Sequence, residues 1–168
     1  MGMQSEQVIW ATPLTANDTN AKEQLGVKRV EDDVTYGRRV YVYTQNADAA
    51  VTISQYDAVA LDSGSWMKKV TSDISDTSIA LPGGVALNTI NPSRYGWILI
   101  AGYAHQINEA NSGAIDVGDA LILTSTDGRV GRVAAGTAPT YLPVAIADVA
   151  DTNTYTCSGF VVCGNMWG

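Results

Sequence analysis

Apolar and polar residues alternate from Arg39 onward with the period of two that is typical of β-strands. In RVYVYTQ, residues 39–45, the valines fall on one face and the tyrosines on the other. Further short apolar runs occupy residues 51–61, 66–70, 83–90, 94–104, 119–124, 142–149 and 154–164, separated by Gly, Pro, Asn and Asp residues that are typical of turns. The pattern predicts short strands and no helix of appreciable length.

The runs repeat. Asp57-Ala58 precedes Asp119-Ala120 by 62 positions, and the Leu99-Ile100 pair precedes Val161-Val162 by the same distance. Between them, VAL at residues 85–87 matches VAI at residues 144–146 with an offset of 59. Two copies of about 60 residues are too few and too long for a solenoid, so the sequence indicates a duplicated β unit.

A single unit of this kind leaves one apolar face uncovered, which a second unit can bury. We therefore predict an all-β protein, an antiparallel β-sandwich or small barrel built from two similar β units with an extended N-terminal arm. The β domain is expected at residues 41–168, with repeat units at about 48–104 and 111–166.

Residues 1–40 lack this alternation and are predicted to form the extended arm. Their apolar residues are sparse, and Trp10, Leu14 and Leu25 are candidate anchors for a partner surface. Lys28 and Arg29 precede the acidic run at residues 31–33, so this part of the arm is predicted to dock by ion pairing.

Charge narrows the possible partners. The formal net charge is −7, and residues 1–45 account for only −1 of it, with five basic and six acidic side chains. The acidic body repels phosphate backbones, so nucleic acid is not expected as a partner.

The start MGMQSEQ and the absence of a long apolar run predict neither a signal peptide nor a membrane span.

No pattern of residues predicts catalysis. The motifs SxxK, GxSxG, HExxH and GxxxxGK[ST] are missing, and the acidic residues stand mostly in turn contexts. If Cys157 and Cys163 lie on one strand, they are about 20 Å apart, so no disulfide between them is expected. The single histidine, His105, has no nucleophile motif near it. We expect no enzyme activity, no cofactor and no metal.

Aromatic residues suggest binding instead. Four Trp and eight Tyr stand against one Phe, and Tyr and Trp are favoured where a surface meets a partner. Some of them, Trp97 above all, belong to half-buried sheet packing. The others leave open a second reading, a receptor- or glycan-binding β module of a virion fibre or tail.

The order of motifs resembles the small capsid decoration, or cement, proteins of tailed bacteriophages. It runs from YVYTQ through VAL and RYGWILIAGYA to AIDVGDALILTSTDGRV and PVAIAD, within residues 36–164. The resemblance implies a non-enzymatic β protein, often a trimer, on the outer surface of the virion head, where it clamps neighbouring major capsid proteins. It also implies that the arm reaches onto the capsid, with Trp10, Leu14, Leu25, Lys28 and Arg29 as the contacts.

Overall fold

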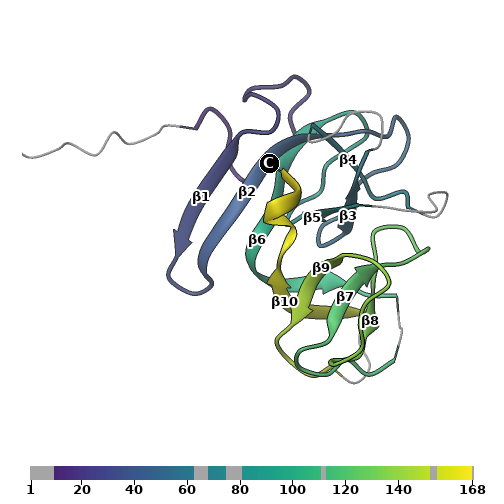
Figure 1. Ribbon diagram of the computed structural model, residues 1–168. Coiled ribbons are helices and arrows are strands. Elements are labelled where there is room, and N and C mark those ends of the chain that lie inside the picture. Colours follow the sequence, from purple (N-terminus) through teal and green to yellow (C-terminus); the bar gives the residue numbers. More distant parts are fainter. Residues whose placement is uncertain (1–9, 63–67, 75–80, 111–112, 152–154, 168) are drawn as a thin grey trace, which may run out of the picture.

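The computed structural model describes residues 10–62, 68–74, 81–110, 113–151 and 155–167. Within these residues the chain forms ten strands and one short 3-10 helix (Figure 1). The strands are β1 (Lys28–Asp33), β2 (Gly37–Asn46), β3 (Ala58–Leu61), β4 (Lys69–Thr71), β5 (Pro82–Val85), β6 (Tyr95–Asn108), β7 (Ala120–Leu123), β8 (Val130–Val133), β9 (Pro143–Ala147) and β10 (Thr156–Val161), and the helix η1 spans Cys163–Trp167. Residues 66 and 67, which begin the apolar run expected at residues 66–70, lie outside the described residues.

Five strands close into a small barrel. The order is β2, β4, β3, β5 and β6, and β6 pairs back with β2. All pairings are antiparallel except that of β2 with β4. Alternate side chains fill its interior, including Val59, Ile98 and Ile100, each at most 1% exposed. Trp167 of η1 lies in the same apolar cluster, and its Nε1 donates to the carbonyl oxygen of Gly83 at 2.7 Å.

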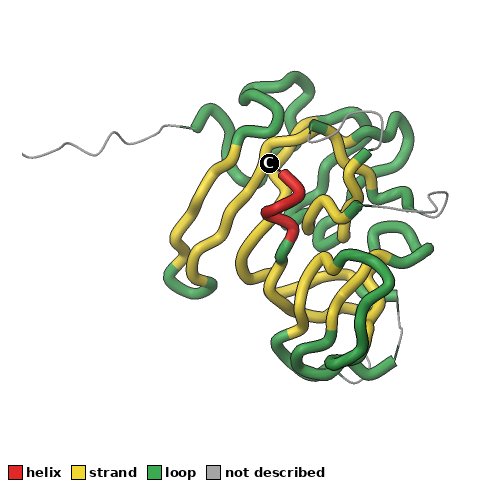
Figure 2. The backbone as a smooth tube through the Cα atoms, in the orientation of Figure 1, coloured by secondary structure: helices red, strands yellow, loops and turns green. Residues whose placement is uncertain are grey.

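The long strand β6 connects this barrel to a second one. Its C-terminal half pairs with β10, and the sheet continues through β9 and β7 to β8. A parallel bridge between Glu109, directly after β6, and Val130 of β8 completes the same order of pairings as in the first barrel. Figure 1 shows the two units one above the other, joined by β6, and Figure 2 shows that loops make up most of the remaining chain. The fold prediction, an all-β protein built from two similar units, is confirmed.

The equivalence of the units extends to individual hydrogen bonds. In the first unit the Ser54 amide donates to Oδ2 of Asp57 at 2.7 Å. In the second, the Asp116 amide donates to Oδ2 of Asp119 at 2.9 Å. The 62-residue offset that the sequence indicates at Asp57-Ala58 therefore marks a shared turn, in which the aspartate side chain replaces a backbone partner.

For the other two pairs of equivalent strands, the structure gives offsets that differ from those predicted from the sequence. Val85 pairs with Leu99, and Ile146 pairs with Phe160, so both β5 to β9 and β6 to β10 are related by 61 positions. The predicted offset of 59 was wrong by two residues, an error that keeps every side chain on its own face. The predicted offset of 62 for the last strand was wrong by one residue and exchanged the two faces.

The N-terminal region also differs from an arm that extends to residue 40. β1 pairs with β2 in register from Lys28–Val42 to Asp33–Gly37, so residues 28–46 form a β-hairpin at the side of the first barrel. The sequence KRVEDD lacks the apolar alternation that predicts a strand, because an edge strand with solvent on both sides does not require an apolar face.

Candidate functional site

Residues 10–27, called the strap here, run over the outer face of the first barrel. The ring of Trp10 meets the ring of Trp97 edge to face, with centroids 5.3 Å apart and an interplanar angle of 87°. Leu14 and Leu25 pack against the same apolar cluster, which also contains Tyr43. The strap therefore covers a face of the barrel that carries large aromatic side chains.

Arg29 fixes the start of the strap to the hairpin. Its guanidinium lies 5.6 Å from the ring centroid of Trp10 and 5.7 Å from that of Trp97, in cation–π geometry. Its Nη1 donates to the carbonyl oxygen of Thr12 at 3.2 Å, and its Nε donates to Glu31 at 2.5 Å. One side chain thus joins the strap, β1 and the barrel.

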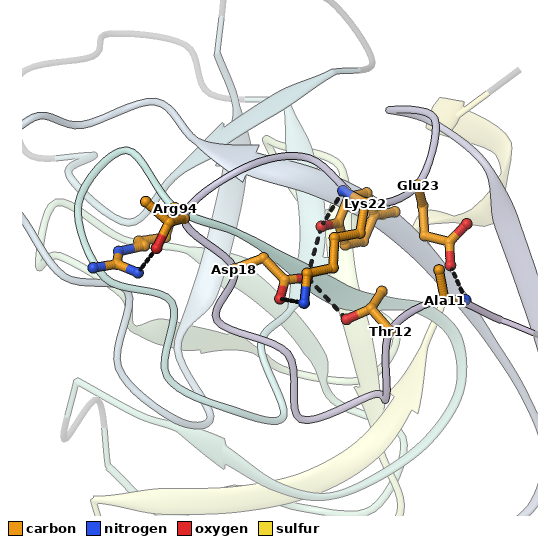
Figure 3. A network of polar contacts seen from close by, with 8 residues as sticks. Ala11, Thr12, Asp18, Lys22, Glu23 and Arg94 are labelled. Atoms are coloured by element: carbon orange, nitrogen blue, oxygen red, sulfur yellow. Dashed lines mark hydrogen bonds and ion pairs between the residues drawn. The ribbon is translucent and has the colours of Figure 1, made fainter.

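Asp18 is the polar centre of the strap (Figure 3). Its carboxylate accepts hydrogen bonds from Thr12 Oγ1 at 2.8 Å and from the Tyr43 hydroxyl at 2.9 Å, and it pairs with Lys22 at 3.3 Å. Burial alone would raise the pKa of Asp18, but these three donors together lower it below its ordinary value. Burial raises the pKa of Tyr43 to about 12, so its hydroxyl stays protonated and donates.

The five residues predicted as capsid contacts all lie in the strap or in β1. Trp10, Leu14 and Leu25 are partly buried against the protein's own barrel, and the guanidinium of Arg29 contacts two indole rings. Lys28 is exposed at the first position of β1. That these residues contact a capsid stays a prediction, and four of the five have a role within the chain itself.

Replacing Trp10 with alanine tests this role. We expect Trp10→Ala to lower the free energy of unfolding by about 2 kcal/mol, because the ring loses its contact with Trp97 and its cation–π contact with Arg29. Urea denaturation followed by circular dichroism measures the change. Unchanged stability would mean that Trp10 is not held by the barrel and would favour a role in partner binding alone.

The two units differ most in what covers this outer face. In the first unit Tyr41 lies opposite Leu99 on β6, and in the second Tyr103 lies opposite Phe160 on β10. Tyr41 and Leu99 are 2% and 0% exposed, whereas Phe160 is 54% exposed. The strap and the second unit cover the first face, but no described segment of the chain covers Phe160 in the same way.

Rings gather on this open face into what we call the aromatic row, formed by Tyr36, Tyr56, Tyr103, His105 and Phe160. Tyr36, from the turn between β1 and β2, stacks on Tyr103 with centroids 5.7 Å apart and on His105 at 5.3 Å. Phe160 lies 5.5 Å from Tyr103. The row therefore draws on the hairpin, β6 and β10 and spans the junction of the two units.

His105 is the polar member of the row. Its Nε2 lies 3.1 Å from the hydroxyl of Tyr56, which approaches the imidazole edge-on. Tyr56 has the left-handed backbone conformation, with φ of 70°, at the turn that is equivalent to Gly118 in the second unit. A tyrosine in place of glycine costs about 1 kcal/mol of backbone strain. At this position the tyrosine also makes the ring contact with His105, which a glycine could not make.

A shallow hollow of about 170 Å³ adjoins the row. His105, Val149, Asp151, Thr156 and Ser158 contribute to its lining. Ser158 stands where the first unit has Trp97, and its hydroxyl donates to Asp148 at 2.6 Å. The surface thus combines exposed rings with a small polar depression, a composition that suits adhesion to another protein.

The described residues hold no cluster that resembles a metal site. No group of three or more His, Cys, Asp or Glu among them could hold a metal ion. Cys157 and Cys163 are free and buried, and burial raises the pKa of each thiol to about 12. No helix found in the described ranges is long and apolar enough to cross a membrane.

The aromatic row could not be predicted from the sequence, because its members come from four separate stretches of the chain. His105 follows the apolar run recognised at residues 94–104, but in the structure it lies inside β6, with its side chain exposed. A usable signal was the pair Tyr103 and His105, which continues the period-two alternation of β6 with rings on one face. The one-residue error in the β10 offset hid the matching position of Phe160.

Comparisons with known proteins return few similarities. No family model matches the chain, and no curated protein matches it. Among solved structures the chain is similar to the head fiber gp8.5 N base of bacteriophage phi29, with 17% sequence identity and a TM-score of 0.47. That similarity covers 72% of this chain and 93% of the phi29 chain.

Proposed function

We propose that the protein is a capsid decoration protein of a tailed bacteriophage, which binds the outer surface of the head and stabilises contacts between major capsid proteins. The observation that carries this proposal is the open aromatic row. The equivalent face of the first unit is buried, while Phe160 in the second is 54% exposed and contacts Tyr103 of the row. The order of sequence motifs supports the same assignment through its resemblance to decoration proteins.

The mechanism is adhesion. Aromatic side chains supply large contact area at low cost in conformational entropy, and buried aromatic anchors dominate the energy of protein interfaces. The mutual stacking of Tyr36, Tyr103 and His105 fixes these rings before a partner arrives, so little further ordering is required. Many copies on one lattice then add their individual contacts by multivalency.

Glycan binding is the second candidate. Its motivation is the hollow lined by polar groups next to exposed rings. Against it, Tyr36 already stacks on Tyr103 and His105, and the Arg39 guanidinium lies over its ring at 5.0 Å from the centroid, so the contacts that a sugar would need on Tyr36 are taken. The decoration role therefore fits the ring geometry better, and a glycan array separates the two candidates.

Sedimentation with phage heads tests the proposal. The double variant Phe160→Ala and Tyr103→Ala is expected to bind expanded heads at least about tenfold more weakly, because it removes an exposed ring of the row and the ring it contacts. Tyr141→Ala is the matched control, because Tyr141 is 47% exposed but outside the row. Wild-type decoration by the double variant, or a specific glycan hit combined with no head binding, would reject the proposal.

A further inference from the structure

The strand β1 lies at an outer edge of the fold. In Figure 1 it flanks β2, and among the strands of the structure it pairs with β2 alone. An edge strand is a template for pairing with another chain, and proteins usually blunt such edges with charge. The charges of β1 are not of one sign, and their order determines which partner fits.

In β1, alternate residues point their backbone N–H and C=O groups toward the open edge. The Tyr43 amide donates to the carbonyl oxygen of Val27 at 3.0 Å, so Val27 directs its carbonyl group toward β2. Because successive residues of a strand point their backbone groups to opposite sides, Lys28, Val30 and Asp32 direct theirs away from β2. These three residues are also the exposed ones of the strand.

The sequence KRVED, residues 28–32, is complementary to itself in reverse. Antiparallel pairing of two copies about a two-fold axis at Val30 places Lys28 opposite Asp32 and Arg29 opposite Glu31 of the second copy. Opposite residues then share a face of the joined sheet, as antiparallel pairing requires. Val30, which is 46% exposed, meets its own counterpart on the axis.

The residues on the other face of β1, Arg29 and Glu31, support the same register. Arg29 and Glu31 already form an ion pair within one strand, at 2.5 Å. The two-fold arrangement places the same pair from the second copy beside it in reverse order, so that the four charges alternate in sign. Parallel pairing in register would instead place like charges opposite each other.

We infer that β1 is a self-association edge, through which two copies of this chain join antiparallel about Val30 into a continuous β2–β1–β1–β2 sheet. Opposite charges and a self-complementary patch are the features expected of an isologous two-fold contact. The inference stands apart from the proposed capsid-binding role of the aromatic row, because no residue of the row lies on β1. It offers a two-fold association in place of the trimer that the family resemblance implies.

Charge exchange at the edge tests the inference with the full chain. In Lys28→Glu each homodimer contact opposes two carboxylates, and in Asp32→Lys it opposes two ammonium groups. We expect each single variant to dimerise at least about tenfold more weakly than wild type. When the two variants are mixed, Glu at position 28 meets Lys at position 32, and Asp32 meets Lys28, so they should form a heterodimer with affinity restored to within about threefold of wild type.

Native mass spectrometry distinguishes the heterodimer by mass, and sedimentation equilibrium gives the affinities. Asp116→Lys is the control, because its side chain is 75% exposed and it lies in the second unit. Val30→Pro adds a check independent of charge, since it removes an amide that points to the partner while leaving the β1–β2 ladder intact. It should weaken dimerisation without loss of folding. A wild-type monomer or trimer up to high micromolar concentration, or single variants that do not pair when mixed, would overturn the inference.

Discussion

The substitution Gly84→Ala is expected to destabilise the protein by roughly 3–5 kcal/mol. Gly84 lies in β5 with φ of +141°, a conformation that L-residues rarely adopt. A Cβ at this position would overlap the carbonyl oxygen of Leu99 and lie 2.7 Å from Cγ2 of Ile98. Both neighbours belong to the central strand β6, so the barrel has to open for the methyl group to fit.

Gly37→Ala separates the steric part of this cost from the backbone part. Gly37 also has positive φ, +70°, but nothing lies within 4 Å of a Cβ added there. Its replacement should cost only about 1 kcal/mol. Urea denaturation of the two variants gives the difference. Equal losses would show that β6 shifts easily and that the close approach of β5 is not what holds the barrel closed.

The repeat was predictable because it rests on a turn with a strict chemical requirement. Asp57 and Asp119 each accept a hydrogen bond from the amide three residues earlier, a role that few other side chains fill. The offset between β5 and β9 could not be predicted as reliably, because it rested on a short apolar triplet, and such triplets match at several offsets. Pro82 and Pro143, which begin the two strands, mark the correct one.

The strap and the aromatic row were less accessible for a different reason. The strap holds to the barrel through isolated side chains such as Trp10 and Asp18, which produce no period in the sequence. The row depends on which of two equivalent faces is left uncovered, and that is decided by where residues 10–27 lie in three dimensions. Composition indicated that Tyr and Trp mattered, but their grouping required the fold.

Opposite pH responses are expected for the equivalent turn residues Asp57 and Asp119. Burial raises the pKa of Asp57, and hydrogen bonds from Asn108 and Ser54 offset this only in part. For Asp119 the burial effect is exceeded by the donors that surround its carboxylate, so its pKa is lowered. These donors are the amides of Asp116 and Ala135, at 2.9 and 2.8 Å, and Arg132 at 3.4 Å.

At neutral pH Asp119→Asn should cost about 3 kcal/mol, because the new amide group faces a backbone donor that cannot turn away. Asp57→Asn should cost only about 1 kcal/mol, since the Asn108 amide can rotate to present its oxygen. A lowered pKa in the folded state means that Asp119 contributes stability above about pH 4, which is lost as pH falls through the folded pKa. The cost of Asp119→Asn should therefore shrink in acid.

The sign is reversed at Asp57. A raised pKa in the folded state means that ionisation weakens the fold, so the contribution of Asp57 is largest in acid and declines as pH rises through the folded pKa. The cost of Asp57→Asn should then grow as pH falls. Urea denaturation of both variants and of wild type between pH 3 and pH 7 gives the two slopes. If the slopes share a sign, the surrounding donors do not distinguish the two turns, and the duplicated aspartates are electrostatically as well as structurally equivalent.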